Sequence, residues 1–167
     1  MIKEVEGNLL TYPGLQVIGH QTNCLGVMGA GIAKQIKANN PELFKSYVRY
    51  CKRYPDAHNI LGTVYFCAAD HSDQIIANMF SQYSFSETTA PFKENGKLRH
   101  TDYEVFKECL NRIHTWMVLN DKTSIGVPDH IGCGLAGGNW DTVKRLIYYE
   151  FEDDDDITLY IVKYKIN

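Results

Sequence analysis

Two glycine-rich segments carry the residues of this chain that are best suited to bind an anion. Residues 23–31 (NCLGVMGAG) contain Gly26, Gly29 and Gly31, and residues 131–139 (IGCGLAGGN) contain Gly132, Gly134, Gly137 and Gly138. Each segment follows a predicted strand and precedes a predicted helix, where free backbone N–H groups and the helix dipole stabilise negative charge. Glycine lets the backbone approach a phosphate that a Cβ would block. The pair predicts a diphosphate site; the alternative is that the glycines only form tight turns.

The second segment also reads GxGxxG, at Gly132, Gly134 and Gly137, so a Rossmann-type dinucleotide site has to be considered. That fingerprint normally opens a doubly wound sheet, whereas only one helix and one strand are predicted after it here. The first segment has GxxGxG spacing, which does not match the fingerprint. Both patterns therefore disfavour a nicotinamide-dependent enzyme.

Hydrophobic periodicity and turn residues arrange strands and helices around these segments. We predict strands over residues 2–6, 15–20, 61–68, 74–80, 123–131 and 157–164, and helices over 32–39, from Pro41, over 101–119 and over 140–151. Thr101 with Glu104 forms a capping box, and Asn139 is the expected N-cap of the last helix. The order of elements predicts a mixed α/β fold of three layers.

A polar stretch over residues 84–100 separates two of these elements and contains Lys93, Lys97 and Arg99. A connection of this length in a compact domain is usually functional or disordered. We consider it a candidate lid.

Composition narrows the class of protein. The chain has 167 residues, 44% hydrophobic and 22% charged, which fits one globular domain. It has no apolar run of about 20 residues and no secretory signal pattern, so we expect no membrane contact and a cytoplasmic location. Its five cysteines form no CxxC pair, which disfavours disulfides and a zinc site, and we find no ligand cluster for another metal. The net charge of −3 and scattered basic residues disfavour binding to duplex nucleic acid.

Four stretches of the chain resemble motifs of the macrodomain superfamily: EGNLL (6–10), GHQTNCLGVMGAGIAKQIK (19–37), Ile60-Leu61-Gly62 and VPDHIGCGLAGGNWD (127–141). They span nearly the whole chain. They are most similar to the branch that holds the ADP-ribose 1''-phosphate phosphatases and the terminal ADP-ribose glycohydrolases. The resemblance implies a single macrodomain over residues 1–167, with an α/β/α sandwich around a central mixed β-sheet. It also implies a ligand such as ADP-ribose, ADP-ribose 1''-phosphate or an ADP-ribosylated macromolecule, and no cofactor.

The resemblance also implies a set of binding residues. Asn8 and Leu9 match the adenine site, where the usual aspartate is an asparagine here, which weakens the acceptor for the adenine amino group. Asn23 matches the residue that contacts the distal ribose, and an amide offers both a donor and an acceptor to hydroxyls. The full set is Asn8, Leu9, Asn23, Val27, Met28, Gly29, Ala30, Gly31, Ile32, Ile131, Gly132, Cys133, Gly134, Leu135, Ala136 and Gly137.

Two positions depart from the related glycohydrolases. There a lysine attacks the ribose and an aspartate assists, and the matching positions are Gln82 and Ala136. An amide is not a nucleophile and a methyl group cannot accept a proton, so a lysine-adduct mechanism is disfavoured. Lys93 or Lys97 could substitute only if the polar stretch closes over the site.

Three residues remain as catalytic candidates: His20, Asn23 and Asp129. The phosphatase branch has a histidine matching His20, and such a group could protonate the leaving ribose oxygen or orient water; the alternative is a structural strand-end histidine. Asp129 could act as a base, or be an exposed carboxylate at a strand end. Cys24 and Cys133 lie inside the loops, but no histidine is fixed beside either, which disfavours a catalytic thiolate.

These observations leave three hypotheses. The leading one is an ADP-ribose-binding domain that hydrolyses ADP-ribose 1''-phosphate to ADP-ribose and phosphate. The second is a non-enzymatic reader of ADP-ribose or ADP-ribosylated partners. The third is an ADP-ribosyl hydrolase that uses substrate-held water in place of the lysine.

Overall fold

The computed structural model describes residues 1–165, and its centre is a six-stranded sheet in the order β1-β8-β7-β2-β4-β3. The strands are β1 (Ile2–Gly7), β2 (Val17–Thr22), β3 (Val64–Ala68), β4 (Ile75–Phe80), β7 (Ser124–Pro128) and β8 (Thr158–Tyr164). All neighbours in the sheet are parallel except β3, which runs antiparallel to β4. The sheet is therefore mixed, as predicted.

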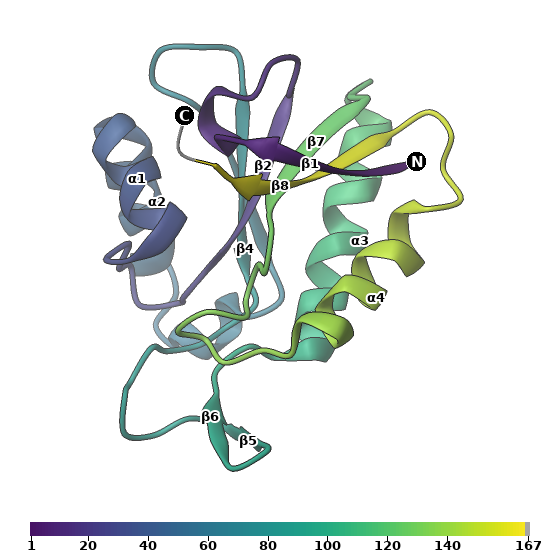
Figure 1. Ribbon diagram of the computed structural model, residues 1–167. Helices are drawn as coiled ribbons and strands as arrows, with labels where there is room; N and C mark the ends of the chain where they lie inside the picture. The colour runs from purple at the N-terminus through teal and green to yellow at the C-terminus, as the bar shows by residue number, and fades with distance from the viewer. Residues whose placement is uncertain (166–167) are drawn as a thin grey trace.

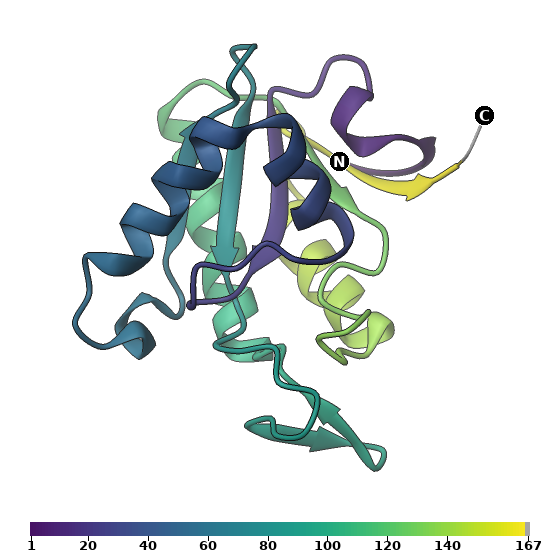
Figure 2. The same ribbon diagram turned by 90° about the vertical axis from the view of Figure 1, so that its left-hand side faces the viewer.

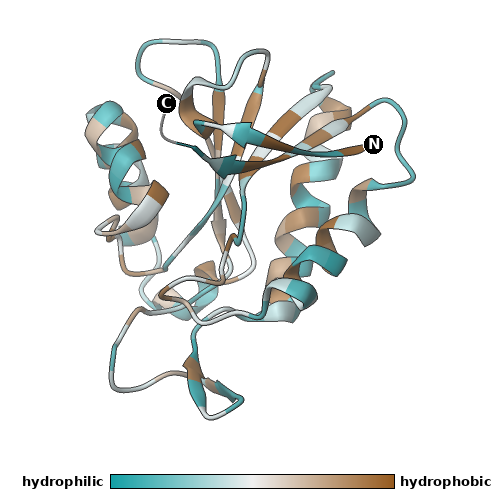
Figure 3. Cartoon of the chain, viewed as in Figure 1, coloured by the Kyte–Doolittle hydropathy of each residue, from teal (hydrophilic) through white to brown (hydrophobic). Residues whose placement is uncertain are grey.

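Helices cover both faces of this sheet (Figure 1). On one face lie α1 (Gly31–Asn39) and α2 (Pro41–Lys52), and on the other lie α3 (Tyr103–Leu119) and α4 (Trp140–Phe151). Two short 3₁₀ turns, η1 (Leu9–Thr11) and η2 (Ala57–Ile60), complete the layers. The helices turn apolar stripes toward the sheet and polar residues toward solvent (Figure 3). The predicted three-layer α/β/α sandwich is confirmed.

The alternation of side chains along each strand builds two separate cores. On β2, Val17 packs under α3 and α4, whereas its neighbour Ile18 packs under α1 and α2. Both side chains are fully buried, and burying an aliphatic side chain of this size contributes about 1.5–3 kcal/mol. The two cores hold the strand ends, and therefore the loops that follow them, in fixed positions.

The predicted boundaries differ from the structure at four main places. Strand β3 begins at Val64 and not at residue 61, because residues 61–62 form a turn after η2. The helix α3 is capped by Asp102, whose side chain accepts from the N–H of Val105, so the prediction of Thr101 as N-cap is wrong. Strand β7 ends at Pro128 and not at residue 131, because His130 adopts a left-handed backbone (φ 58°) that cannot continue a strand. Strand β2 lies two residues later than predicted because its parallel pairing with β4 continues to Thr22.

The polar stretch over residues 84–100 contains a β-hairpin that we did not predict. Its strands are β5 (Phe92–Glu94) and β6 (Lys97–Arg99), joined by Asn95 and Gly96. Both turn residues have positive φ (52° and 77°), which matches the twist of a two-residue hairpin turn. The hairpin projects away from the body of the molecule (Figure 2).

The carboxyl ends of the parallel strands β2, β4 and β7 lie together, so the segments that follow these strands gather at this end of the sheet (Figure 1). These are residues 23–30, 81–102 and 129–139. In the part of the chain described, no helix has the length and apolar character needed to cross a membrane. All five cysteines are free thiols.

Candidate functional site

The first glycine-rich segment leads into α1, and the first turn of this helix has unpaired backbone N–H groups. The N-cap residue, Ala30, has no side-chain acceptor, and the first backbone bond runs from Lys34 N to Ala30 O at 3.2 Å. Within residues 1–165, the N–H groups of Gly31, Ile32 and Ala33 therefore have no partner. No acidic residue occupies the first turn. Free donors at the positive end of a helix dipole make this a favourable position for a phosphate.

The second glycine-rich segment folds into a compact loop held by its own backbone. Its internal bonds are Cys133 N to His130 O at 2.9 Å, Gly137 N to Gly134 O at 3.0 Å and Gly138 N to Gly132 O at 2.9 Å. These bonds leave the N–H groups of Gly134, Leu135 and Ala136 without a partner among the described residues. Leu135 is 86% exposed, so the loop tip is open to a ligand. Successive free N–H groups in such a loop form a second anion-binding position.

The polar stretch packs against this second loop as a fixed arm. A Cβ at Gly137, which has φ 77°, would lie 2.3 Å from the carbonyl oxygen of Leu98. Arg99 lies between the rings of Phe92 and Tyr103, at 4.3 and 4.0 Å from their centroids. It also forms an ion pair with Glu94 at 3.0 Å. Lys93 and Lys97 are exposed on the projecting hairpin.

Asn23 organises the first loop from within. Its Oδ1 accepts from the N–H groups of Leu25 at 3.0 Å and Val27 at 3.3 Å, and its Nδ2 donates to Val27 O at 2.7 Å. The hydroxyl of Tyr47 donates to the main-chain oxygen of Asn23 at 2.7 Å. The amide of Asn23 is thus engaged in shaping the backbone that presents α1. Nδ2 has a second N–H group, which has no partner among the described residues and remains available to a ribose hydroxyl.

His20 lies inside the core under α1 and α2, on the same face of β2 as Ile18. It is fully buried, and its Nε2–H donates to Oδ1 of Asn78 at 2.7 Å. Burial lowers the pKa of His20 to about 4, so the ring is neutral at pH 7. Its Nδ1 has no partner among residues 1–165.

Asp129 lies on the other side of the sheet. It continues the alternation of Ile125 and Val127, which pack under α3 and α4. Its Oδ2 accepts from Nδ1 of His130 at 2.8 Å, and the His130 ring stacks on Trp140 at 4.9 Å. The structure therefore does not bring Asp129 together with His20. His130, a half-exposed titratable group in a left-handed conformation, is a feature that no sequence pattern revealed.

The two positions that depart from the related glycohydrolases do come together. Gln82 forms a β-bridge with Thr101, and the Thr101 N–H donates to Ala136 O at 3.2 Å. The side chain of Gln82 is engaged on both ends: Oε1 accepts from Gln21 and Nε2 donates to Ser84 O, each at 2.8 Å. The Gln82 amide therefore links the end of β2 to the segment after β4, whereas a catalytic lysine at this position would have to extend toward the ligand.

The far end of the site begins where β1 ends. Asn8 caps η1, since its Oδ1 accepts from Leu10 N at 3.0 Å. Leu9 is 4% exposed and packs into the core, so it fixes the turn. The carboxamide of Asn8 is half-buried and retains its free NH₂ group.

The comparison with known families identifies the chain. The model of the Macro domain family matches residues 20–147, which is most of the sequence. The chain belongs to the Macro domain family.

Relatives of this macrodomain carry two kinds of name. It is 29% identical to an ADP-ribose 1''-phosphate phosphatase of Saccharomyces cerevisiae, over 95% of this chain and 97% of the relative. It is 28% identical to a DNA ADP-ribosyl glycohydrolase of Mycobacterium tuberculosis, over 94% of this chain but only 40% of the relative. The macrodomain of Mycobacterium tuberculosis DarG superposes with a TM-score of 0.79 at 25% identity, covering 100% of this chain and 99% of that one. The predicted family and fold are confirmed.

The cysteines of the macrodomain loops are not activated. Burial is the largest cause that raises the pKa of both Cys24 and Cys133 to about 12. Both therefore remain protonated thiols at neutral pH, and a thiolate is the nucleophilic form. Among residues 1–165, no group of three or more His, Cys, Asp or Glu side chains is arranged to hold a metal.

The buried His20 makes the stability of the macrodomain depend on pH. An unfolded histidine binds a proton near pH 6.5, whereas folded His20 does so only near pH 4. The unfolded state therefore binds a proton first as the pH falls. The contribution of neutral His20 to the free energy of unfolding is fully present above pH 6.5, and about 3 kcal/mol of it should be lost as the pH falls to 4. Urea unfolding of wild type and His20→Gln from pH 7 to 4 measures this contribution as the difference between the two pH profiles. His58→Gln, at an exposed histidine, is the control, and identical profiles for wild type and His20→Gln would contradict the prediction.

Proposed function

We propose that this macrodomain binds ADP-ribose with its diphosphate between the two glycine-rich loops. The observation that carries the proposal is the pair of clusters of backbone N–H groups at the carboxyl ends of β2 and β7. The N–H groups of residues 31–33 and of residues 134–136 have no partner within the described chain. Two clusters suit the two phosphates of one ligand, and neither uses a charged side chain. The adenosine then extends toward Asn8 and the distal ribose toward Asn23.

We further propose that the bound substrate is ADP-ribose 1''-phosphate and that the macrodomain releases its terminal phosphate. Support comes from the phosphatase relative, which this chain matches over nearly the full length of both. It also comes from Gln82 and Ala136, which cannot perform the lysine and aspartate chemistry of a glycohydrolase. In this scheme water attacks the phosphorus, the bond between phosphorus and the C1'' oxygen breaks, and a proton of the water passes to that oxygen, which stays on the ribose. Backbone N–H groups stabilise the phosphoryl charge. His20 is fully buried and its ring donates to Asn78, so it takes no direct part in this scheme.

The direct test is release of inorganic phosphate from ADP-ribose 1''-phosphate. We expect stoichiometric formation of ADP-ribose and phosphate by the wild type, and strong loss of the activity in Ala30→Asp, which places a carboxylate at the first loop. Ala38→Asp, with the same charge change at an exposed position of the same helix, is the control. Absence of phosphate release by a protein that binds free ADP-ribose would refute the phosphatase and leave the binding proposal intact.

A non-enzymatic reader is the second candidate, because the structure commits the candidate catalytic side chains elsewhere. His20 is buried, the Asn23 amide is engaged in its own loop, and Asp129 pairs with His130. A reader would bind ADP-ribose or ADP-ribosylated macromolecules without turnover. Calorimetry with ADP-ribose, combined with assays on ADP-ribosyl phosphate and ester substrates, separates the two candidates: heat of binding without any product favours the reader.

The adenine end provides a gain-of-binding prediction. Replacing Asn8 by aspartate keeps the oxygen that caps η1 and adds a charged acceptor for the adenine amino group. Because hydrogen bonds to charged groups are stronger than neutral ones by about 1 kcal/mol, the dissociation constant for ADP-ribose should fall by about fivefold. Calorimetry on wild type, Asn8→Asp and Asn8→Ala measures the effect. A weaker affinity in Asn8→Asp than in wild type would remove Asn8 from the adenine site.

A further inference from the structure

The two edges of the central sheet differ in how they are protected. Strand β1 reads IKEVEG, and its three charged side chains, Lys3, Glu4 and Glu6, are exposed. Charged side chains on an edge strand discourage pairing with another chain. Strand β3, at the opposite edge, reads VYFCA and contains no charged residue. The β3 edge therefore lacks the protection that the β1 edge has.

The backbone of β3 offers a regular row of groups on its open side. Phe80 N donates to Thr63 O at 3.1 Å and Ala69 N donates to Gln74 O at 2.8 Å, which fixes the odd-numbered residues as those bonded to β4. The N–H and C=O groups of Val64, Phe66 and Ala68 therefore point away from β4. No other strand of the described chain pairs with this side of β3.

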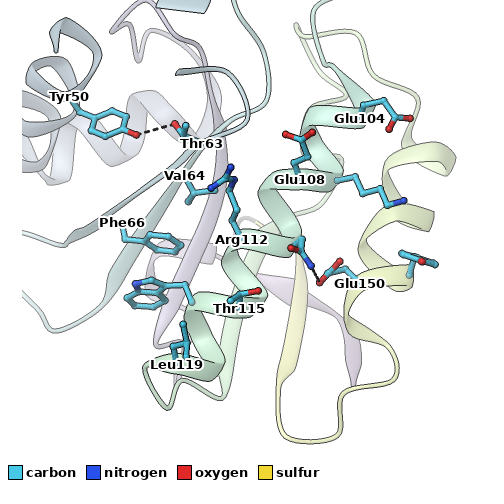
Figure 4. A pocket seen from close by; sticks show the side chains of 14 residues that line it. Tyr50, Thr63, Val64, Phe66, Glu104, Glu108, Arg112, Thr115, Leu119 and Glu150 are labelled. Carbon is cyan, nitrogen blue, oxygen red and sulfur yellow. Dashed lines mark hydrogen bonds between the residues drawn. The ribbon is translucent and has the colours of Figure 1, made fainter. Parts of the chain in front are cut away.

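A groove of about 1020 Å³ extends from this edge across the exposed face of α3 to Tyr149 and Glu150 on α4 (Figure 4). Its apolar lining includes Phe66, whose ring stacks on Trp116 with centroids 4.4 Å apart, and Leu119 and Tyr149, which are 77% and 72% exposed. Large apolar side chains exposed around one groove mark a surface that another molecule covers. The groove also carries charges of both signs: Glu104, Glu108 and Glu150 against Lys107 and Arg112.

We propose that the occupant of this edge is a second copy of the same chain, which pairs its β3 antiparallel to the first across a two-fold axis at Phe66. The outward groups at residues 64, 66 and 68 are symmetric about residue 66. Each N–H of one copy therefore meets a C=O of the other, and Val64 of one copy lies opposite Ala68 of the other. No like charges face each other on these strands.

The groove supports the same occupant. A two-fold axis places α3 of each copy beside the groove of the other, so exposed apolar residues such as Leu119 become covered. Because the groove contains both acidic and basic side chains, self-association can bring the acids of one copy near the bases of the other. A strongly acidic or basic peptide would find no such match.

The first test removes one outward donor from the edge. The Ala68 N–H points away from β4, so Ala68→Pro deletes it without breaking a bond of the sheet, and proline is tolerated on edge strands. Sedimentation velocity over a wide concentration range should show wild type as a dimer. The dissociation constant of Ala68→Pro should rise by about tenfold or more, since two bonds are lost per dimer. Ala68→Ser, which keeps the N–H, should associate as wild type does.

A second pair of variants keeps the test valid if the proline variant fails to fold. Leu119→Lys puts a charge into the groove, whereas Val118→Lys changes the neighbouring residue, which is 58% exposed and does not line it. We expect Leu119→Lys to dissociate the dimer and Val118→Lys to leave it intact. A wild type that stays monomeric at all concentrations overturns the proposal and leaves the edge to an extended segment of another protein. Equal dissociation in both lysine variants overturns it as well.

Discussion

Replacing Ala30 by aspartate is expected to make the protein more stable and at the same time to weaken its binding of ADP-ribose strongly. Ala30 is the N-cap of α1 and has no side chain to accept from the free N–H groups of the first turn. An aspartate there accepts from one of them, which stabilises a helix by about 1 kcal/mol. The same carboxylate occupies the donors intended for a phosphate and repels its charge. We expect affinity to fall by about a hundredfold, from the loss of roughly 3 kcal/mol of charge-assisted bonding.

Thermal or urea unfolding measures the change in stability, and calorimetry on the same preparation measures the change in affinity for ADP-ribose. Ala38→Asp introduces the same charge elsewhere on α1 and should leave affinity near that of wild type. Ala30→Ser offers a neutral cap and should fall between wild type and Ala30→Asp. If Ala30→Asp gains stability but still binds ADP-ribose as tightly as wild type does, the diphosphate is not at the start of α1.

The substitution with the largest expected cost in stability is Gly137→Ala. A Cβ at this position would lie 2.3 Å from Leu98 O, and the backbone has φ 77°, which an L-residue adopts with strain. Either the second loop or the arm formed by residues 84–100 must move. We expect a loss of about 3 kcal/mol in the free energy of unfolding, accompanied by weaker ADP-ribose binding because the loop shifts.

Gly134→Ala is the matched control in the same loop. No atom lies within 4 Å of a Cβ at Gly134, and its φ is not in the left-handed region. Its stability should change by no more than about 0.5 kcal/mol. Urea denaturation of both variants decides the matter. Equal stabilities would mean that the arm is not packed on the second loop and can move as a lid.

The sequence predicted those parts of the fold that depend on local patterns. The stripe of α4 and its Asn139 cap follow from helical spacing and from the preference of asparagine for N-caps. The capping prediction for α3 was wrong by one residue because Thr101 and Asp102 are both good caps. Tertiary contacts decided between them: the Thr101 hydroxyl donates to Gly132 O at 2.6 Å, which leaves Asp102 to cap the helix. The Asn95-Gly96 pair was a turn signal for the hairpin that we did not use.

The sequence predicted the parts of the candidate site that are made of backbone N–H groups. It did not predict the surroundings of the side chains, which depend on tertiary packing. Glycines between a strand and a helix indicate free N–H groups whatever the rest of the fold. The environment of His20 depends on the face of β2 on which it lies and on Asn78, which is distant in the sequence. Its burial could have been anticipated, since period-two alternation places His20 beside Ile18. The engagement of the Asn23 amide depends on the conformation of the loop, which composition does not specify.

The central claim is that the two loops together bind the diphosphate of ADP-ribose, and a crystal structure of the complex tests it most directly. We expect phosphate oxygens within hydrogen-bond distance of the N–H groups of Gly31 to Ala33 and of Gly134 to Ala136, with the adenine beside Asn8. The same electron density will show which side chains approach C1'' of the distal ribose. A ligand bound away from both loops, or one whose phosphates contact neither set of N–H groups, would contradict the claim.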